Sequence, residues 1–352
     1  MNIKIIGSGS YIPTNIVANS DFADHEFLNE DGSKFKQSNE IIASKFKDIT
    51  GIEERRYVST DLKASDIAFI AAKKAIENAA IDPETLDYII IAHNFGDVKK
   101  GAIQSDTVPS LATRVKHLLQ IKNPKCVGYD ILFGCPGWIE GMIHASAFIK
   151  AGIAKRCLII GAETLSRVVD PHDRDSMIYS DGAGATIIES TEKEGGFLGH
   201  NSATHAFEEA NYLYFGSSFN KNLEPDVRYI KMYGRKIYEF ALKNVPLAMK
   251  ECLENSHIEI NQVSKILIHQ ANEKMDVAIV ERFYKLYNKE VPKNIMPMSI
   301  HTLGNSSVAT VPTLYDLLIN KQVEDHELKP NDIILMASVG AGMNINAIVY
   351  KI

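Results

Sequence analysis

Hydrophobic positions along the chain follow two patterns. Short runs such as 88–92, 157–162 and 265–269 carry apolar residues on both faces, which is typical of strands buried between layers of helices. Between such runs, the segment 65–80 carries Ile and Ala at helical spacing and predicts a helix with Ser65 as its N-cap. This alternation predicts an α/β fold.

The chain also resembles itself at a spacing of about half its length. Residues 78–94 and 255–272 each close a helical stretch and enter an apolar run, with Ile89–Ile91 matching Ile266–Ile268. Further matches follow in the same order, 131–138 with 300–308 and 157–165 with 333–342. Ordered matches at nearly constant spacing predict a duplicated fold.

The polar stretch 189–196 marks the expected boundary, which gives a first half of residues 1–190 and a second half of residues 191–352. Two segments of the second half depart from the pattern. We expect Pro246 to kink or divide the helix around it. Residues 205–228 lack periodicity and predict a long loop.

Composition narrows the function. The net charge of −6 argues against a nucleic-acid partner. The start of the chain reads as a short strand rather than a leader, and no apolar run approaches the roughly 18 residues of a membrane span, so we expect a cytoplasmic protein without a membrane partner. The four cysteines and eleven histidines show no metal-binding spacing, and we expect neither a metal nor disulfides.

Unlike residues occupy equivalent positions of the two repeats. Cys135 stands where the second half has Asn305, and His269 stands where the first half has Ala92. A purely structural duplication has little reason to place a thiol, an imidazole and an amide at strand ends, where ligand sites of α/β sheets gather. Together the three groups predict a nucleophilic site.

Each of the three residues has a structural alternative. Cys135 follows a glycine, and Pro136 suits the first helical position, so the thiol would lie at a helix N-terminus that lowers its pKa. Cysteine is equally a small apolar core residue, the role that we assign to Cys126, Cys157 and Cys252. His269 alone fits a structural residue, and Asn305 alone fits a turn.

The glycine-bearing turn 338–344 follows a strand and could offer backbone N–H groups to an oxyanion. As a nucleotide-binding motif it fails, because the glycine pairs at 7, 182 and 340 lack the third glycine of GxGxxG and no Walker sequence occurs. We therefore expect no resident cofactor.

Several motifs together resemble the thiolase-fold condensing enzymes, most closely β-ketoacyl-[acyl-carrier-protein] synthase III. They are "TGIEERR", "GCPGW", "GAETLSRVVDPHDRDSMIYSDGAGA", "HQANEKM", "GNSSVATVP" and "GAGMNINAIVY", and they span nearly the whole chain. The resemblance implies a thiolase-like fold in which two α/β halves form a layered αβαβα core. It also implies a homodimer that condenses acyl thioesters.

The resemblance assigns a role to each candidate residue. Cys135 is the acylated nucleophile, and His269 with Asn305 binds the thioester carbonyl of the second substrate. The backbone N–H groups of Cys135 and Ala341 form an oxyanion hole. Donor and acceptor would be thioesters of coenzyme A or of acyl carrier protein.

Departures from the family pattern concern the substrates. Lys45 and Ile49 stand where the family often has a tryptophan and an arginine for coenzyme A, whereas Arg174 matches a family arginine near the nucleotide. These changes favour a carrier-protein donor. Lys274 matches a basic family position that could meet an acidic carrier protein, although a solvated surface lysine fits equally.

The segment 93–110 is longer than the family loop that crosses the dimer interface and caps the partner's acyl pocket. The capping position holds Val108, and its small size predicts an acyl group longer than acetyl. Trp138, the only tryptophan, fits core packing better than substrate contact.

Alternatives remain open within and outside this chemistry. The chain could be a specialised synthase for a secondary lipid or an alkylresorcinol-type product, or an acyltransferase to oxygen or nitrogen. It could also be a catalytically silent partner subunit, but such a subunit has no chemical need for Cys135, His269 and Asn305 together.

Overall fold

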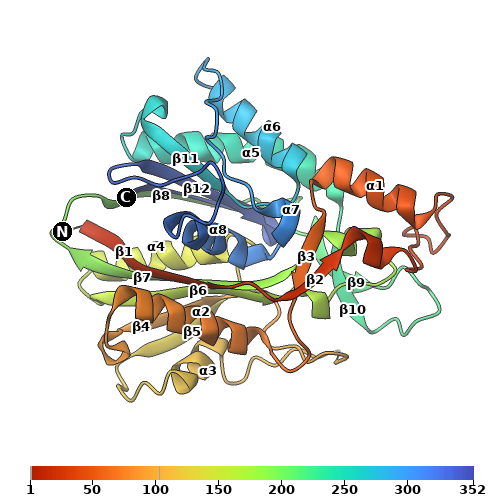
Figure 1. The fold of residues 1–352 in the computed structure, drawn as a ribbon, viewed down its shortest axis with the longest axis horizontal. Coiled ribbons are helices and arrows are strands. Elements are labelled where there is room, and N and C mark those ends of the chain that lie inside the picture. The colour runs from red at the N-terminus through yellow and green to blue at the C-terminus, as the bar shows by residue number, and fades with distance from the viewer. Residues whose placement is uncertain (1, 103) are drawn as a thin grey trace.

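Two mixed sheets stack face to face with helices between and outside them (Figure 1). The computed structural model describes residues 2–102 and 104–352. The first sheet has the strand order β1 (Asn2–Tyr11), β7 (Asp181–Thr191), β6 (Arg156–Thr164), β4 (Tyr88–Ala92) and β5 (Val127–Ile131). The second has the order β8 (Gly196–Thr204), β13 (Asn344–Lys351), β12 (Ile333–Gly340) and β11 (Val263–Ile268).

The two sheets repeat one topology. In each, the first strand pairs antiparallel with the second, the second pairs antiparallel with the third, and the third pairs parallel with the fourth. The N–H of Ile266 bonds to the carbonyl of Ile295, so residue 295 lies beside β11 as β5 lies beside β4. The predicted duplication is therefore confirmed, with β4 corresponding to β11 and β6 to β12.

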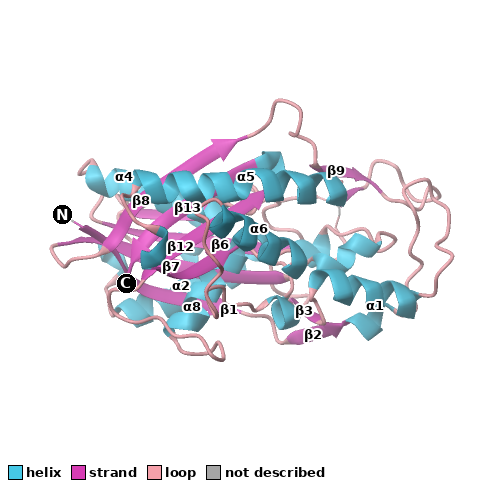
Figure 2. Ribbon diagram, turned by 90° about the horizontal axis from the view of Figure 1, so that it is seen from above, coloured by secondary structure: helices cyan, strands magenta, loops and turns pink. Residues whose placement is uncertain are grey.

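Helices form three layers around these sheets. The middle layer is α4 (Gly137–Lys150) and α8 (Thr310–Ile319), which contact both sheets. Nine of the ten residues of α8 are buried, as a helix covered on all sides requires. The outer layers are α2 (Ala64–Ala79) with α3 (Leu111–Leu118), and α5 (Gly234–Asn255) with α6 (Glu273–Lys285). The predicted αβαβα fold is confirmed (Figures 1 and 2).

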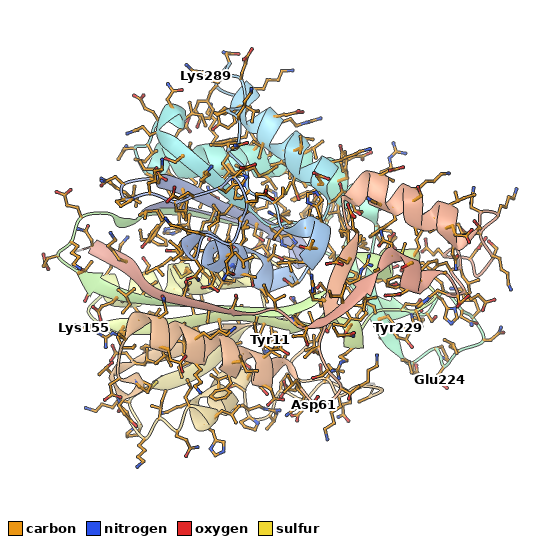
Figure 3. All side chains as sticks on the ribbon, viewed as in Figure 1. Tyr11, Asp61, Lys155, Glu224, Tyr229 and Lys289 are labelled. Atoms are coloured by element: carbon orange, nitrogen blue, oxygen red, sulfur yellow. The ribbon has the colours of Figure 1, made fainter. Side chains whose placement is uncertain are left out.

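The remaining elements gather at the end of the molecule away from both termini (Figures 1 and 2). They are α1 (Asn39–Thr50), α7 (Ile300–Leu303), the paired strands β2 (Asn15–Ala18) and β3 (Glu54–Tyr57), and the hairpin β9 (Leu213–Ser217) and β10 (Arg228–Met232). Figure 3 labels Glu224 and Tyr229 on this hairpin at that end. Of these elements, β9 and β10 line the cavity described below, and α1 lines the opening beside it.

The structure corrects three local predictions. The segment 205–228 is not one long loop, because β9 lies within it and pairs with β10. Of the two effects expected at Pro246, division of the helix is wrong, because α5 runs through it. The carbonyl of Leu242, which proline leaves without its helical partner, accepts from Nη1 of Arg282 at 3.5 Å. Ser65 is not an N-cap, since α2 begins at Ala64.

The polar stretch 189–196 spans the connection between β7, which ends at Thr191, and β8, which begins at Gly196. The exact division of the chain at residue 190 stays a prediction.

No helix among residues 2–102 and 104–352 is both long and apolar enough to cross a membrane.

Candidate active site

Cys135 and His269 follow the carboxyl ends of strands, whereas Asn305 follows the short helix α7, so the expectation that all three lie at strand ends is wrong for Asn305. Cys135 comes four residues after β5, and His269 directly follows β11. Strands β4, β5 and β6 run parallel, so their carboxyl ends meet at one edge of the sheet, where ligand sites of α/β folds lie. His269 reaches the same cavity from the second sheet.

Cys135, His269 and Asn305 all line one cavity of about 340 Å³. Its remaining walls are mostly apolar and include Phe95, Leu213, Phe215, Ile230, Met232 and Ile237. The hairpin β9–β10 supplies four of these side chains. The cavity thus combines three convergent polar groups with an apolar chamber suited to a hydrocarbon chain.

Cys135 is partly exposed and not sealed in the core. Helix α4 begins at Gly137, and Pro136 occupies the N-cap position, one residue earlier than expected. Burial raises the pKa of the Cys135 thiol to about 11, while the hydrogen bond from Ser307 acts to lower it. The expected lowering of this pKa by the helix N-terminus is therefore wrong for the free protein, because removal from water outweighs it.

His269 is only 3% exposed, and burial lowers its pKa to about 4. The ring is neutral at pH 7. Its Nδ1 is buried and has no hydrogen-bond partner in the described part of the chain. A buried N–H without a partner is rarer than a buried acceptor without one, which favours the tautomer with the proton on Nε2. His269 then presents a neutral donor to the cavity.

This pKa gives a direct prediction. We expect the ring of His269 to titrate near pH 4 in the folded protein, measured from histidine NMR shifts and assigned by comparison with the His269→Gln variant. The folded pKa lies below the usual 6.5, so the folded state binds this proton less readily and loses stability as pH falls from about 6.5 towards 4. A midpoint near 6.5 would contradict the burial argument.

The side chain of Asn305 is held by its own loop. Its Oδ1 accepts from the backbone N–H of Ser307 at 2.8 Å, and its backbone bonds to the segment 178–180 on both sides. With the oxygen occupied, the amide Nδ2 is the group left to donate towards the cavity. Asn305 therefore supplies a second neutral donor beside His269.

Close backbone contact brings two amides together at the thiol. A Cβ on Gly340 would collide with the backbone nitrogen of Cys135, and a Cβ on Gly134 would lie 2.6 Å from the nitrogen of Ala341. Only glycine at these positions lets the turn after β12 approach the segment before α4. The two N–H groups expected to form an oxyanion hole are thus neighbours.

Sequence reasoning missed three polar residues around the thiol. Ser307 donates from Oγ to Sγ of Cys135 at 3.3 Å, and Asn94 donates from Nδ2 to Oγ of Ser307 at 3.1 Å. Asn94 in turn bonds through its backbone and side chain to Oε1 of Glu163. The motifs "GNSS" and "GAETLSR" contained two of them, but neither motif shows that the residues meet.

The other predicted binding residues lie outside this cavity. Arg174 lines an adjoining opening together with Lys45 and Ile49, and its guanidinium lies over the ring of Phe35 at 5.1 Å. Lys274 is exposed on the first turn of α6. The two openings share several lining residues, so Arg174 lies on a route to the thiol.

Two further side chains, Val108 and Trp138, do not line the cavity. Val108 is 84% exposed and is absent from the lining of the cavity in its own chain. Trp138 is buried in the cluster between the two sheets, so its assignment to core packing is confirmed.

Comparison with known proteins adds an independent observation. Residues 129–206 match the 3-oxoacyl-[acyl-carrier-protein] synthase III family, and residues 253–352 match its C-terminal part. The chain is 34% identical to β-ketoacyl-[acyl-carrier-protein] synthase III of Clostridium perfringens, covering 100% of this chain and 99% of that protein. It is 30% identical to the enzyme of the same name from Prochlorococcus marinus, covering 100% and 97%.

A solved structure agrees with this likeness. The crystal structure of 3-oxoacyl-[acyl-carrier-protein] synthase III from Aquifex aeolicus superposes with a TM-score of 0.80 at 29% identity, covering 99% of this chain and 100% of that one. Both the sequence and the fold therefore match over the full length.

Proposed function

Because the chain belongs to the 3-oxoacyl-[acyl-carrier-protein] synthase III family of acyltransferases, we propose that it condenses an acyl thioester with a malonyl- or β-ketoacyl thioester to give a β-ketoacyl product. One observation carries this proposal: Cys135, His269 and Asn305 line a single, largely apolar cavity. A nucleophile and two neutral donors beside an apolar chamber suit acyl transfer followed by carbon–carbon bond formation.

The first step acylates Cys135. Sγ attacks the carbonyl carbon of the donor thioester, and the oxygen becomes an oxyanion that accepts from the N–H groups of Cys135 and Ala341. The donor's C–S bond then breaks, and its thiolate leaves as a thiol with the proton that Cys135 gave up. The apolar walls hold the acyl chain.

The second step forms the new bond. With a malonyl thioester, loss of CO2 leaves an enolate whose oxygen accepts from His269 and Asn305. The enolate carbon attacks the acyl carbonyl on Cys135, the C–S bond breaks, and the cysteine thiolate recovers a proton from solvent. Neutral donors suit this role, because they stabilise the enolate without holding the substrate carboxylate as an ion pair.

Residues outside the cavity offer contacts for both kinds of thioester. Arg174, stacked on Phe35, offers a cation and an aromatic face that suit a nucleotide, whereas Lys45 and Ile49 in the same opening weaken the family's coenzyme A pattern. Lys274, exposed on α6, suits an acidic carrier protein. We propose a carrier-protein thioester for at least one substrate, no resident cofactor and a cytoplasmic location.

Features of the first sheet support a homodimer. Strand β5 is an outer strand, and such edges are usually covered. Leu132, just after β5, is 69% exposed, and Val108 is 84% exposed. A second copy against this edge would cover these apolar side chains, and Val108 would then cap the partner's cavity.

The size of Val108 predicts donor length. We expect Val108→Phe to lower the preference for long over short acyl donors by about tenfold, because one or two extra methylenes in a filled pocket cost that much. The measurement is the kcat/KM ratio across a series of saturated acyl thioesters. Ile153→Phe, at an exposed apolar position away from the cavity lining, is the control. An unchanged ratio in a protein shown to be dimeric by sedimentation would contradict the capping role.

Product analysis tests the proposed function. The protein is incubated with acyl donors on coenzyme A and on acyl carrier protein, together with malonyl, β-ketoacyl, alcohol or amine acceptors, and products are identified by mass spectrometry. We expect a β-ketoacyl thioester and release of CO2 from the malonyl acceptor. Formation of esters or amides instead would favour the acyltransferase alternative. A product formed from the β-ketoacyl acceptor and from no other acceptor would favour the specialised synthase.

A further inference from the structure

A continuous chain of hydrogen bonds connects a buried carboxylate to the sulfur of Cys135. Glu163, at the end of β6, is 1% exposed. Its Oε1 accepts from the backbone N–H of Asn94 at 2.7 Å and also from the Asn94 side chain. Asn94 follows β4, the parallel neighbour of β6. The carboxylate of Glu163 therefore holds both the backbone and the side chain of Asn94.

The direction of each bond follows from the chemistry of the groups. An amide NH2 is a donor only, so Nδ2 of Asn94 uses one hydrogen on Glu163 and the other on Oγ of Ser307 at 3.1 Å. Since Oγ of Ser307 accepts this bond, its own hydrogen is free to point at Sγ of Cys135, 3.3 Å away. The sulfur of Cys135 thus receives a hydrogen bond from Ser307, whose hydroxyl is oriented by Asn94. Asn94 is in turn held by Glu163.

The backbone around Ser307 is shaped to keep this position. Ser307 has φ of +52°, a left-handed conformation that is uncommon for serine, and its N–H is tied to Oδ1 of Asn305. A Cβ on Gly161 of β6 would collide with the carbonyl of Val308, so glycine there allows the 305–308 loop to lie against β6. The strand that carries Glu163 therefore also seats the loop that carries Ser307.

We propose that Glu163 and Asn94 are positioning residues that hold the Ser307 hydroxyl as a fixed hydrogen-bond donor to Cys135. This inference rests on the proposed role of Cys135 as nucleophile, and it adds a group that favours the thiolate. The thiolate occurs twice in the reaction, as attacking group in acylation and as leaving group in condensation. A donor to sulfur lowers the barrier of both steps without itself changing covalently.

Alkylation of Cys135 by iodoacetamide tests the chain without any acyl substrate. Its rate below the thiol pKa follows the thiolate fraction, and peptide mass spectrometry separates Cys135 from the three buried cysteines. We expect Ser307→Ala to slow alkylation at pH 8 by about tenfold, which corresponds to about one pKa unit for a lost bond to a charged group. Ser306→Ala removes a neighbouring hydroxyl that bonds to Thr310, and we expect it to leave the rate unchanged.

Glu163 is tested by two neutral substitutions. Gln keeps an oxygen for Asn94, whereas Ala removes it, so we expect Glu163→Ala to react about threefold to tenfold more slowly than Glu163→Gln. With Ser307→Ala already present, the two substitutions should react at the same rate, because the connection to sulfur is gone. A general loss of folding would persist in that background.

Equal rates for Glu163→Ala and Glu163→Gln in the presence of Ser307 would overturn the proposal, as would a difference that persists after Ser307→Ala. Failure of the proposed function is read separately, since absence of a β-ketoacyl product leaves the alkylation rates measurable.

Discussion

Cys135→Ala abolishes formation of the β-ketoacyl product and of any acyl-enzyme, because none of the other three cysteines, all of them described, lines the cavity. The remaining cysteines are buried in the hydrophobic core, with Cys126 and Cys157 in the first half and Cys252 in the second. The measurement is product formation from an acyl donor and a malonyl acceptor, followed by mass spectrometry. We expect turnover to fall to the background of the assay without enzyme.

Cys126→Ala is the matched control, since it removes a buried thiol that does not line the cavity. It should keep near-wild-type turnover if the protein folds. Product formed by Cys135→Ala at a substantial fraction of the wild-type rate would show that the acyl group is carried elsewhere.

Asn305→Ala separates the two steps of the reaction. Acylation of Cys135 should proceed, because the oxyanion of that step lies on backbone N–H groups. Condensation should slow by about a hundredfold or more, equivalent to about 3 kcal/mol, because the enolate loses one of its two donors. The two rates are measured by single-turnover acylation and by product release from the preformed acyl-enzyme.

Asn320→Ala, the same substitution at the end of α8, removes side-chain bonds to Asp316, and neither Asn320 nor Asp316 lines the cavity. We expect it to affect neither step. Equal loss of both steps in Asn305→Ala would contradict this division of roles, and would point to a general disturbance of the loop that also holds Ser307.

The sequence predicted the architecture because the duplication leaves a strong trace. The match of Ile89–Ile91 with Ile266–Ile268 corresponds to β4 and β11, which occupy the same place in their sheets. Buried strands and helices keep their hydrophobic spacing even where sequence diverges, so the pattern survives. The same alignment indicated Cys135, His269 and Asn305 as departures from symmetry, and they share one cavity.

Features that depend on tertiary contacts could not be predicted in this way. The rise in the pKa of Cys135 comes from burial by distant segments, which a local helix argument does not include. Strand β9 pairs only with β10, and where α5 passes through Pro246, Arg282 of another helix donates to the carbonyl that the proline leaves free. The hydrogen bonds from Glu163 to Asn94 and from Asn94 to Ser307 join residues that are 69 and 213 positions apart in the sequence.

The central claim is that the sulfur of Cys135 carries the acyl group. The most direct test is incubation of the folded protein with a panel of coenzyme A and acyl-carrier-protein thioesters, followed by digestion and peptide mass spectrometry. The account predicts the acyl mass on the peptide that contains Cys135 and on no peptide containing Cys126, Cys157 or Cys252. An unlabelled Cys135 peptide across the whole panel, or label on another cysteine, would contradict it.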